Sequence, residues 1–146
     1  MSARLRAFRG AGRGATAVEF ALVVGPMLLV LMGISEFGRF FWTAQSLQRV
    51  ATRAARCVGL LQSDCAVASA YSAASTISYV QTQASGYGVT LTTAMIVPNA
   101  SATCAGVSNF ATVQINYTFT TLAPTLIPSL AAGVPVTAKA CFPNQA

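Results

Sequence analysis

Few side chains in this chain are suited to acid–base or nucleophilic chemistry. The 146 residues contain no histidine, one lysine (Lys139), three carboxylates (Glu19, Glu36 and Asp64) and four cysteines. The carboxylates lie far apart in the sequence, and no base is placed to activate a serine or threonine hydroxyl. The sequence has no glycine-rich phosphate loop and no metal-ligand spacing. We therefore predict that the protein is not an enzyme and has no catalytic residues, no metal and no cofactor.

The four cysteines are better suited to disulfides than to catalysis. They stand at positions 57, 65, 104 and 141, all C-terminal to a long apolar segment. An even number of cysteines on one side of a membrane is typical of an oxidising compartment. Four cysteines allow three connectivities, and the sequence alone does not choose among them. We favour Cys57–Cys65, which are close in sequence, together with Cys104–Cys141; the alternative is four buried free thiols.

Glu19 is the carboxylate in the most unusual place. It lies in "GRGATAVEFALVV" (residues 12–24), at the start of an apolar stretch that no other charge enters until Glu36. Thr16 and Glu19 have the spacing of a capping box, and a carboxylate is favourable at a helix N-terminus. Capping explains why Glu19 is tolerated there, but it does not explain the arginine-rich head that precedes it.

The composition points to a membrane protein, because 54% of the residues are hydrophobic and only 8% are charged. The net charge is +6, but four arginines in the first 14 residues account for most of it, and the remainder carries only +2. A short basic head beside an apolar segment is typical of a membrane face. No basic patch interleaved with aromatic residues follows, so we predict no nucleic-acid partner.

Residues 15–35 are predicted to form a transmembrane helix. These 21 residues would span about 31 Å at about 1.5 Å per residue, enough to cross a bilayer. The preceding arginines predict a cytoplasmic N-terminus and an exported C-terminal part. Pro26 predicts a kink without a break. The run is too long for an ordinary secretory signal, and no small-x-small cleavage site follows it, so removal of the whole segment is not expected.

The helical pattern continues over residues 36–60, where it becomes amphipathic. The apolar stripe is expected to comprise Phe37, Phe40, Phe41, Ala44, Leu47, Ala51, Ala54, Ala55 and Val58. The polar side is expected to comprise Gln45, Gln48, Arg49, Thr52, Arg53 and Arg56. Residues 40–42 (Phe-Phe-Trp) resemble an aromatic belt at the membrane exit, and Gly59 is a candidate end of the helix.

Two charged groups on this extension have alternative interpretations. Glu36 and Arg39 are interpreted as an interfacial ion pair that ends the lipid span, with contact to a partner subunit as the alternative. The arginines at 49, 53 and 56 share one helix face. That face is interpreted as solvated, with anionic lipid or an acidic partner as the alternative.

Residues 61–146 predict a small αβ domain. Ser63 or Asp64 is expected to cap a second helix that ends near residues 86–88. Its apolar face is expected to comprise Ala66, Val67, Ala70, Ala74 and Ile77, with Tyr71 as a further candidate. Strands are expected within residues 89–97, 111–121 and 134–142, the last at an edge because of its prolines, with a loop over 122–133. The second strand alternates, with an expected buried face of Val113, Ile115, Tyr117 and Phe119 and an open face of Thr112, Gln114, Asn116 and Thr118. The fold class is therefore α+β: a long N-terminal transmembrane and amphipathic helix, a short helix and a small antiparallel sheet of about three strands.

The sequence also resembles a known family. "RG" followed by "ATAVEF" and an apolar helix resembles the class III leader of type IV pilin-like proteins. The wider stretch, with Pro26 and the exit motif Glu36-Phe37-Gly38-Arg39, is similar to TadE-like minor pseudopilins of the tight-adherence (Tad/Flp) pilus. The resemblance covers roughly residues 10–60. The related TadF type remains an alternative.

This resemblance implies that residues 1–14 are a leader removed by a prepilin peptidase between Gly14 and Ala15. Glu19 then becomes the fifth residue of the mature chain. Its carboxylate would pair with the N-terminal amine of a neighbouring subunit during assembly. The implied partners are other pilin and pseudopilin subunits, the peptidase, the inner-membrane assembly platform and membrane lipid.

The resemblance also implies a single-pass protein of the bacterial inner membrane, with a periplasmic C-terminal domain and incorporation into an extracellular pilus as a further step. Such a subunit initiates assembly, caps the tip or adheres, and the sequence does not choose among these roles. Two rival interpretations remain. One is a signal-anchored periplasmic binding or structural domain that is never cleaved, and the other is a membrane-tethered enzyme.

Overall fold

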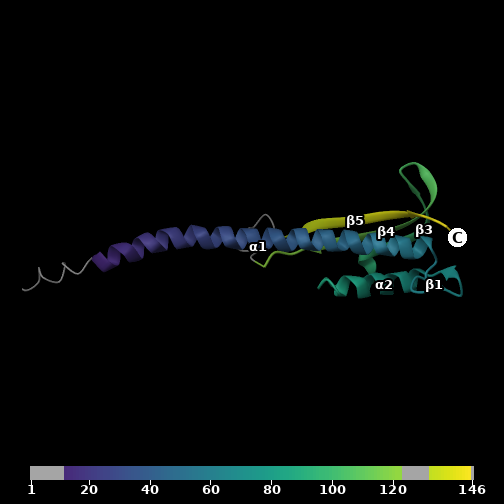
Figure 1. The fold of residues 1–146 in the computed structure, drawn as a ribbon, viewed down its shortest axis with the longest axis horizontal. Coiled ribbons are helices and arrows are strands. Elements are labelled where there is room, and N and C mark those ends of the chain that lie inside the picture. Colours follow the sequence, from purple (N-terminus) through teal and green to yellow (C-terminus); the bar gives the residue numbers. More distant parts are fainter. Residues whose placement is uncertain (1–11, 123–131, 146) are drawn as a thin grey trace, which may run out of the picture. The chain divides into compact units, whose positions relative to one another are not determined.

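A computed structural model describes residues 12–122 and 132–145 (Figure 1). Most of the predicted leader and most of the predicted loop over residues 122–133 lie outside these ranges. The chain divides into two compact units, Met1–Gly38 and Arg39–Ala146. We call them the N-terminal and C-terminal units. A long helix, a short helix and an antiparallel sheet are present, which confirms the α+β class.

The first helix, α1, is uninterrupted from Gly12 to Gly59. It is not broken at Pro26, and it ends at the glycine that the sequence indicated. Two backbone bonds close its last turn, from the N–H of Gln62 to the carbonyl of Cys57 (3.0 Å) and from Leu61 to Val58 (3.1 Å). Leu61 has φ 47°, so the helix ends in a Schellman motif with a leucine at the left-handed position.

Within the C-terminal unit, α1 buries one stripe of mostly small residues. Its fully or almost fully buried members are Leu47, Val50, Ala51, Ala54, Ala55, Cys57 and Val58. The six residues predicted for the polar side are all exposed. Two residues predicted for the stripe do not belong to it, since Phe37 is 69% exposed and Phe41 is 56% exposed. The buried face follows positions 43, 47, 50 and 54, and Phe41 points away from it.

The prediction that a helix begins at Ser63 or Asp64 is wrong. Residues 66–71 instead form a small hairpin in which β1 (Ala66–Val67) pairs antiparallel with β2 (Ala70–Tyr71). The two turn residues, Ala68 and Ser69, have φ values of 50° and 63°. This left-handed pair is typical of a type I′ turn, whose twist matches that of a hairpin.

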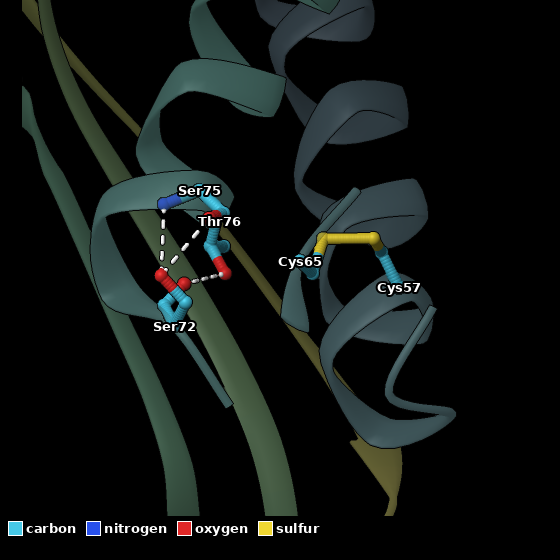
Figure 2. The surroundings of a disulfide bond; sticks show 5 residues. All are labelled: Cys57, Cys65, Ser72, Ser75 and Thr76. Atoms are coloured by element: carbon cyan, nitrogen blue, oxygen red, sulfur yellow. Dashed lines mark hydrogen bonds between the residues drawn. A yellow bond between two sulfur atoms is a disulfide. The ribbon is translucent and has the colours of Figure 1, made fainter. Parts of the chain in front are cut away.

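The second helix, α2, runs from Ala73 to Ser85. Ser72 is its N-cap, because its Oγ accepts from the backbone N–H of Ser75 at 3.2 Å (Figure 2). The buried face consists of Thr76, Val80 and Ala84, so the predicted apolar face was also wrong in large part. The predicted end near residues 86–88 is confirmed.

The main sheet has the order β3-β4-β5, and both pairings are antiparallel. Strand β3 covers Ile96–Cys104, β4 covers Val107–Phe119 and β5 covers Val134–Pro143. The strand expected over residues 89–97 therefore begins later, after the short 3-10 helix η2 (Thr93–Met95). Ala105 and Gly106 have φ values of 51° and 84°, which gives β3 and β4 a tight turn.

One face of the sheet packs against the helices. The buried strand residues that form the core with the helices are Ile96, Ala111, Val113, Ile115, Phe119, Val136, Ala138 and Ala140. The alternation predicted for β4 holds at most positions, since Val113, Ile115 and Phe119 are buried and Asn116 and Thr118 are exposed. Burying each such aliphatic or aromatic side chain contributes about 1.5–3 kcal/mol, so this interface is the main source of stability in the unit.

Strand β5 is an edge strand, as its prolines predicted. Pro135 and Pro143 lie near its two ends. Between them, Nε2 of Gln48 on α1 donates a hydrogen bond to the carbonyl of Lys139 at 3.0 Å. The side of the strand that faces away from β4 therefore lacks two N–H donors and has one carbonyl already bonded.

The C-terminal end of α1 lies against the C-terminal end of β5. The N–H of Gln145 donates to the carbonyl of Gly59 at 3.1 Å. A Cβ at position 59 would stand 2.7 Å from Cδ1 of Phe142 and 3.1 Å from the carbonyl oxygen of Pro143. The helix therefore needs a glycine at this point because the strand approaches so closely.

We predict that Gly59→Ala lowers the free energy of unfolding by about 1–3 kcal/mol, because the added methyl overpacks this contact. Thermal unfolding of the full chain in detergent, followed by circular dichroism, measures the change. Gly38→Ala is the matched control, since a Cβ there meets nothing within 4 Å. Equal melting temperatures for the Gly59→Ala and Gly38→Ala variants would contradict the predicted packing.

Candidate membrane and assembly surface

The N-terminal unit exposes an apolar helix surface. All but one of the large hydrophobic side chains from Val18 to Phe37 are at least 39% exposed, and most exceed 55%. The exception is Val24, which is half-buried. The most apolar 18-residue window of α1 has a mean hydropathy of 2.3, and none of it is buried. A helix that is apolar on all sides is stable only when lipid or other apolar helices surround it. This surface is suited to a bilayer or to packing between subunits.

The predicted cleavage site and Glu19 lie in the first turns of α1. Gly14 and Ala15 fall within the helix, and Glu19 follows five residues after Gly14. The Glu19 side chain is exposed, like its apolar neighbours Val18 and Phe20. An exposed carboxylate on an apolar helix surface is a costly group in lipid, and it is accessible to a cation outside the chain.

The exit motif Glu36-Phe37-Gly38-Arg39 spans the boundary between the two units. Glu36 is buried, at 8% exposure, whereas Phe37 is 69% exposed. Arg39 is exposed as well. Glu36 precedes Phe40 by one helical turn, so it lies in line with the face that α1 buries further on. The motif therefore lies between a largely exposed stretch of the helix and a stretch with one buried face.

Arg39 and Phe40, the first residues of the C-terminal unit, both contact Phe119 at the end of β4. The Phe40 and Phe119 rings meet edge to face, with centroids 5.4 Å apart and an interplanar angle of 85°. The guanidinium carbon of Arg39 lies 5.5 Å from the centroid of Phe119. An aromatic pair and a cation–π contact each contribute about 0.5–1.5 kcal/mol. Together they fix the end of the strand to the beginning of the unit.

The arginine row lies on the exposed face of α1. Nη1 of Arg53 donates to Oε1 of Gln83 on α2 at 3.3 Å. A shallow groove of about 270 Å³ is lined by Gln45, Gln48, Arg49, Thr52 and Arg53. No described residue provides a carboxylate in this lining, so the groove is basic.

Both disulfides have the pairing that the sequence favoured. Cys57–Cys65 joins the last turn of α1 to the segment before β1, with Cα atoms 5.9 Å apart and both residues fully buried (Figure 2). Cys104–Cys141 joins β3 to β5, with Cα atoms 6.5 Å apart. Thr112 lies opposite Cys141 and is only 7% exposed, although alternation had placed it on the open face.

The described residues were also compared with what a metal site or a catalytic nucleophile would need. They contain no group of three or more cysteine, aspartate or glutamate side chains that could hold a metal ion. Burial raises the pKa of the Tyr71 phenol, and no described residue hydrogen-bonds to its hydroxyl.

The sequence identified the separate parts of this surface but missed Phe119. Alternation along β4 placed Phe119 on the inner face, yet nothing in the sequence paired it with Arg39 and Phe40, which are about 80 residues away. The only signal was that Phe40 and Phe119 are both aromatic, with Phe119 at the end of β4.

Comparison with known proteins supports the interpretation of the N-terminal region. Residues 14–56 match the model of the TadE-like protein family. The match begins at Gly14 and includes Glu19, the exposed apolar helix, the exit motif and the arginine row. No curated protein and no solved structure matches the chain. The similarity therefore concerns α1, and residues 57–146 have no counterpart in these comparisons.

We predict that Phe119→Ala lowers the free energy of unfolding by about 3–5 kcal/mol, because it removes a buried aromatic side chain and both of its contacts to α1. Thermal unfolding of the full chain measures the loss. Phe41→Ala is the control, since Phe41 is 56% exposed. We expect Phe41→Ala to change the free energy of unfolding by less than about 0.5 kcal/mol. Equal effects of the two substitutions would show that Phe119 does not fix β4 to the helix.

Proposed function

We propose that this pilin-like protein, similar over residues 14–56 to TadE-like proteins of the Tad pilus, is a minor pilin that acts in pilus assembly. The observation that carries the proposal is that the TadE-like match coincides with the exposed apolar helix. Most large apolar side chains of that helix are exposed, so it needs lipid or other subunits around it. In this proposal the protein works by packing and carries out no catalysis.

The subunit first resides in the bacterial inner membrane as a single-pass protein. Arginines at positions 4, 6, 9 and 13 keep the N-terminus in the cytoplasm, and the C-terminal unit lies in the periplasm. The two disulfides support this orientation, because disulfides persist in the oxidising periplasm and not in the cytoplasm.

A prepilin peptidase then cuts after Gly14. The cut removes the basic head, which otherwise holds the N-terminus at the cytoplasmic face, and it gives Ala15 a free, positively charged α-amine. The exposed carboxylate of Glu19 accepts this type of charge from a neighbouring subunit. Pairing the two groups offsets the cost of both charges in an apolar environment and sets the axial register of adjacent helices.

The apolar side chains of α1 allow the helix to leave lipid. In a filament, neighbouring α1 helices replace the acyl chains around residues 18–37, so little apolar surface is transferred to water. The proposed partners are other pilin and pseudopilin subunits, the inner-membrane assembly platform and the peptidase. The subunit primes the base, caps the tip or presents an adhesive surface.

The alternative is a signal-anchored periplasmic domain that is never cleaved. The capping-box interpretation of Thr16 and Glu19 is wrong for the uncut chain, because α1 begins at Gly12 and Thr16 lies inside the helix. The specific observation in favour of the alternative is that α1 runs without interruption through Gly14 and Ala15. The two proposals differ in the N-terminus of the mature chain. The mass of the intact protein distinguishes them directly.

We predict that co-expression with a prepilin peptidase shortens the chain by residues 1–14, so that it begins at Ala15. Intact mass spectrometry of the membrane-extracted protein measures this with the active peptidase and with a catalytically inactive one. Gly14→Ala keeps the head and the helix but removes the glycine that the peptidase requires, so we expect it to stay uncut. A full-length chain in the presence of the active peptidase would support the uncleaved anchor.

We also predict that Glu19→Gln leaves membrane insertion intact but lowers the amount of the subunit in sheared pili at least tenfold. The substitution keeps the side chain's size and removes the charge that pairs with the α-amine. Asp64→Asn, which neutralises an exposed carboxylate in the C-terminal unit, is the control and should not change incorporation. Normal incorporation of the Glu19→Gln subunit would refute the pairing.

A further inference from the structure

One end of the C-terminal unit is defined by the direction of β4 relative to α1. Phe40 contacts Phe119, and Gly59 lies beside Phe142, which pairs with Ala111 on β4. Position 40 of the helix is therefore next to position 119 of β4, and position 59 lies beside Phe142, the β5 residue opposite position 111. The lengths agree, since 19 helical residues rise about 28 Å and eight strand residues about 27 Å. The helix and the strand run antiparallel.

The chain that leaves β4 therefore continues past Phe40 toward the start of the unit. Arg39 is the first residue of this unit and follows the apolar helix directly in the chain. Leu122 is three residues beyond Phe119, within about 10 Å along the chain. Leu122 and the beginning of α1 in this unit thus lie at the same end, although 80 residues separate them in sequence.

The exposed side chains at this end are those that favour a lipid–water interface. Leu122 is 73% exposed, Phe41 is 56% exposed and Trp42 is 59% exposed, and Arg39 is exposed beside them in the chain. We call Arg39, Phe41, Trp42 and Leu122 the membrane-side patch. Aromatic residues and arginine are enriched at the headgroup level, where rings are half solvated and guanidinium groups meet phosphates. No acidic residue occurs between Glu36 and Asp64 to repel a phosphate surface.

We propose that the sheet end next to Leu122 rests on the outer face of the bilayer, so that this subunit contacts lipid at a second point besides its anchor. The proposal rests on the proposed membrane anchor. Lipid is favoured over a second copy because the patch begins at the residue that directly follows the apolar helix. Arg39 is bonded directly to Gly38, the last residue of the unit that carries the apolar helix, so this end of the C-terminal unit is tethered to the proposed anchor. The contact orients the C-terminal unit on the membrane before assembly.

The single tryptophan makes this proposal directly testable. Trp42→Phe removes the only tryptophan, so that one new tryptophan can report on one position. In this background we would prepare Leu122→Trp, Val107→Trp and Leu28→Trp in the full chain. Val107 is the matched control because it is 59% exposed and begins β4 at the opposite end of the strand. Leu28 reports on the anchor.

Each variant is reconstituted in vesicles of phosphatidylethanolamine and phosphatidylglycerol, with and without bromine on the acyl chains. We expect bromolipid to quench Leu28→Trp and Leu122→Trp and to leave Val107→Trp unchanged, with a blue-shifted emission for Leu122→Trp. A non-reducing gel checks that both disulfides form in each variant.

The outcomes separate the two proposals. Quenching of Leu28→Trp without quenching of Leu122→Trp would overturn the second contact and leave the anchor intact. Absence of quenching at Leu28 would overturn the anchor and, with it, the second contact. A blue shift at Leu122 that bromolipid does not quench and that grows with protein density would identify a second copy as the occupant and overturn the lipid contact.

Discussion

The structure depends on one constraint: a single helix must satisfy two different surroundings. Along residues 18–37, α1 exposes most of its large apolar side chains. Along residues 40–58 it buries one narrow stripe against a sheet and exposes a polar face to water. The change takes place within the four residues 36–39, where a buried glutamate, an exposed phenylalanine, a glycine and an exposed arginine follow one another.

The small residues of the buried stripe explain how so small a unit holds together. Alanines at positions 51, 54 and 55 let the sheet approach the helix closely, and Gly59 permits backbone contact at the end. Such a core is thin, so covalent constraints matter. One disulfide closes the end of α1 onto the hairpin, and the other joins the two outer strands. A small domain gains most from constraints placed at the margins of its core.

The fold class, the end of α1 at Gly59 and the edge position of β5 were predictable, because periodicity, glycine and proline act locally. The start of α2 was not. Alanine and serine in residues 66–72 suit a helix, but the Cys57–Cys65 bond and a left-handed turn at Ala68 and Ser69 favour a hairpin. The site was predictable only where its residues are adjacent in sequence. The contact of Phe119 with Arg39 and Phe40 depends on how β4 packs on α1. Local sequence patterns do not predict that packing.

The edge of β5 affects how copies of this protein can associate at high local concentration. When many copies of one protein are packed together, an unpaired strand edge of one copy can pair with a strand edge of the next. Repeated pairing of this kind builds a continuous sheet of the amyloid type. Here Pro135 and Pro143 withhold N–H donors, and Gln48 already bonds to the carbonyl of Lys139. Growth by strand addition is therefore disfavoured at this edge. In the proposed function, subunits would then associate through their exposed apolar helices and not through this strand edge.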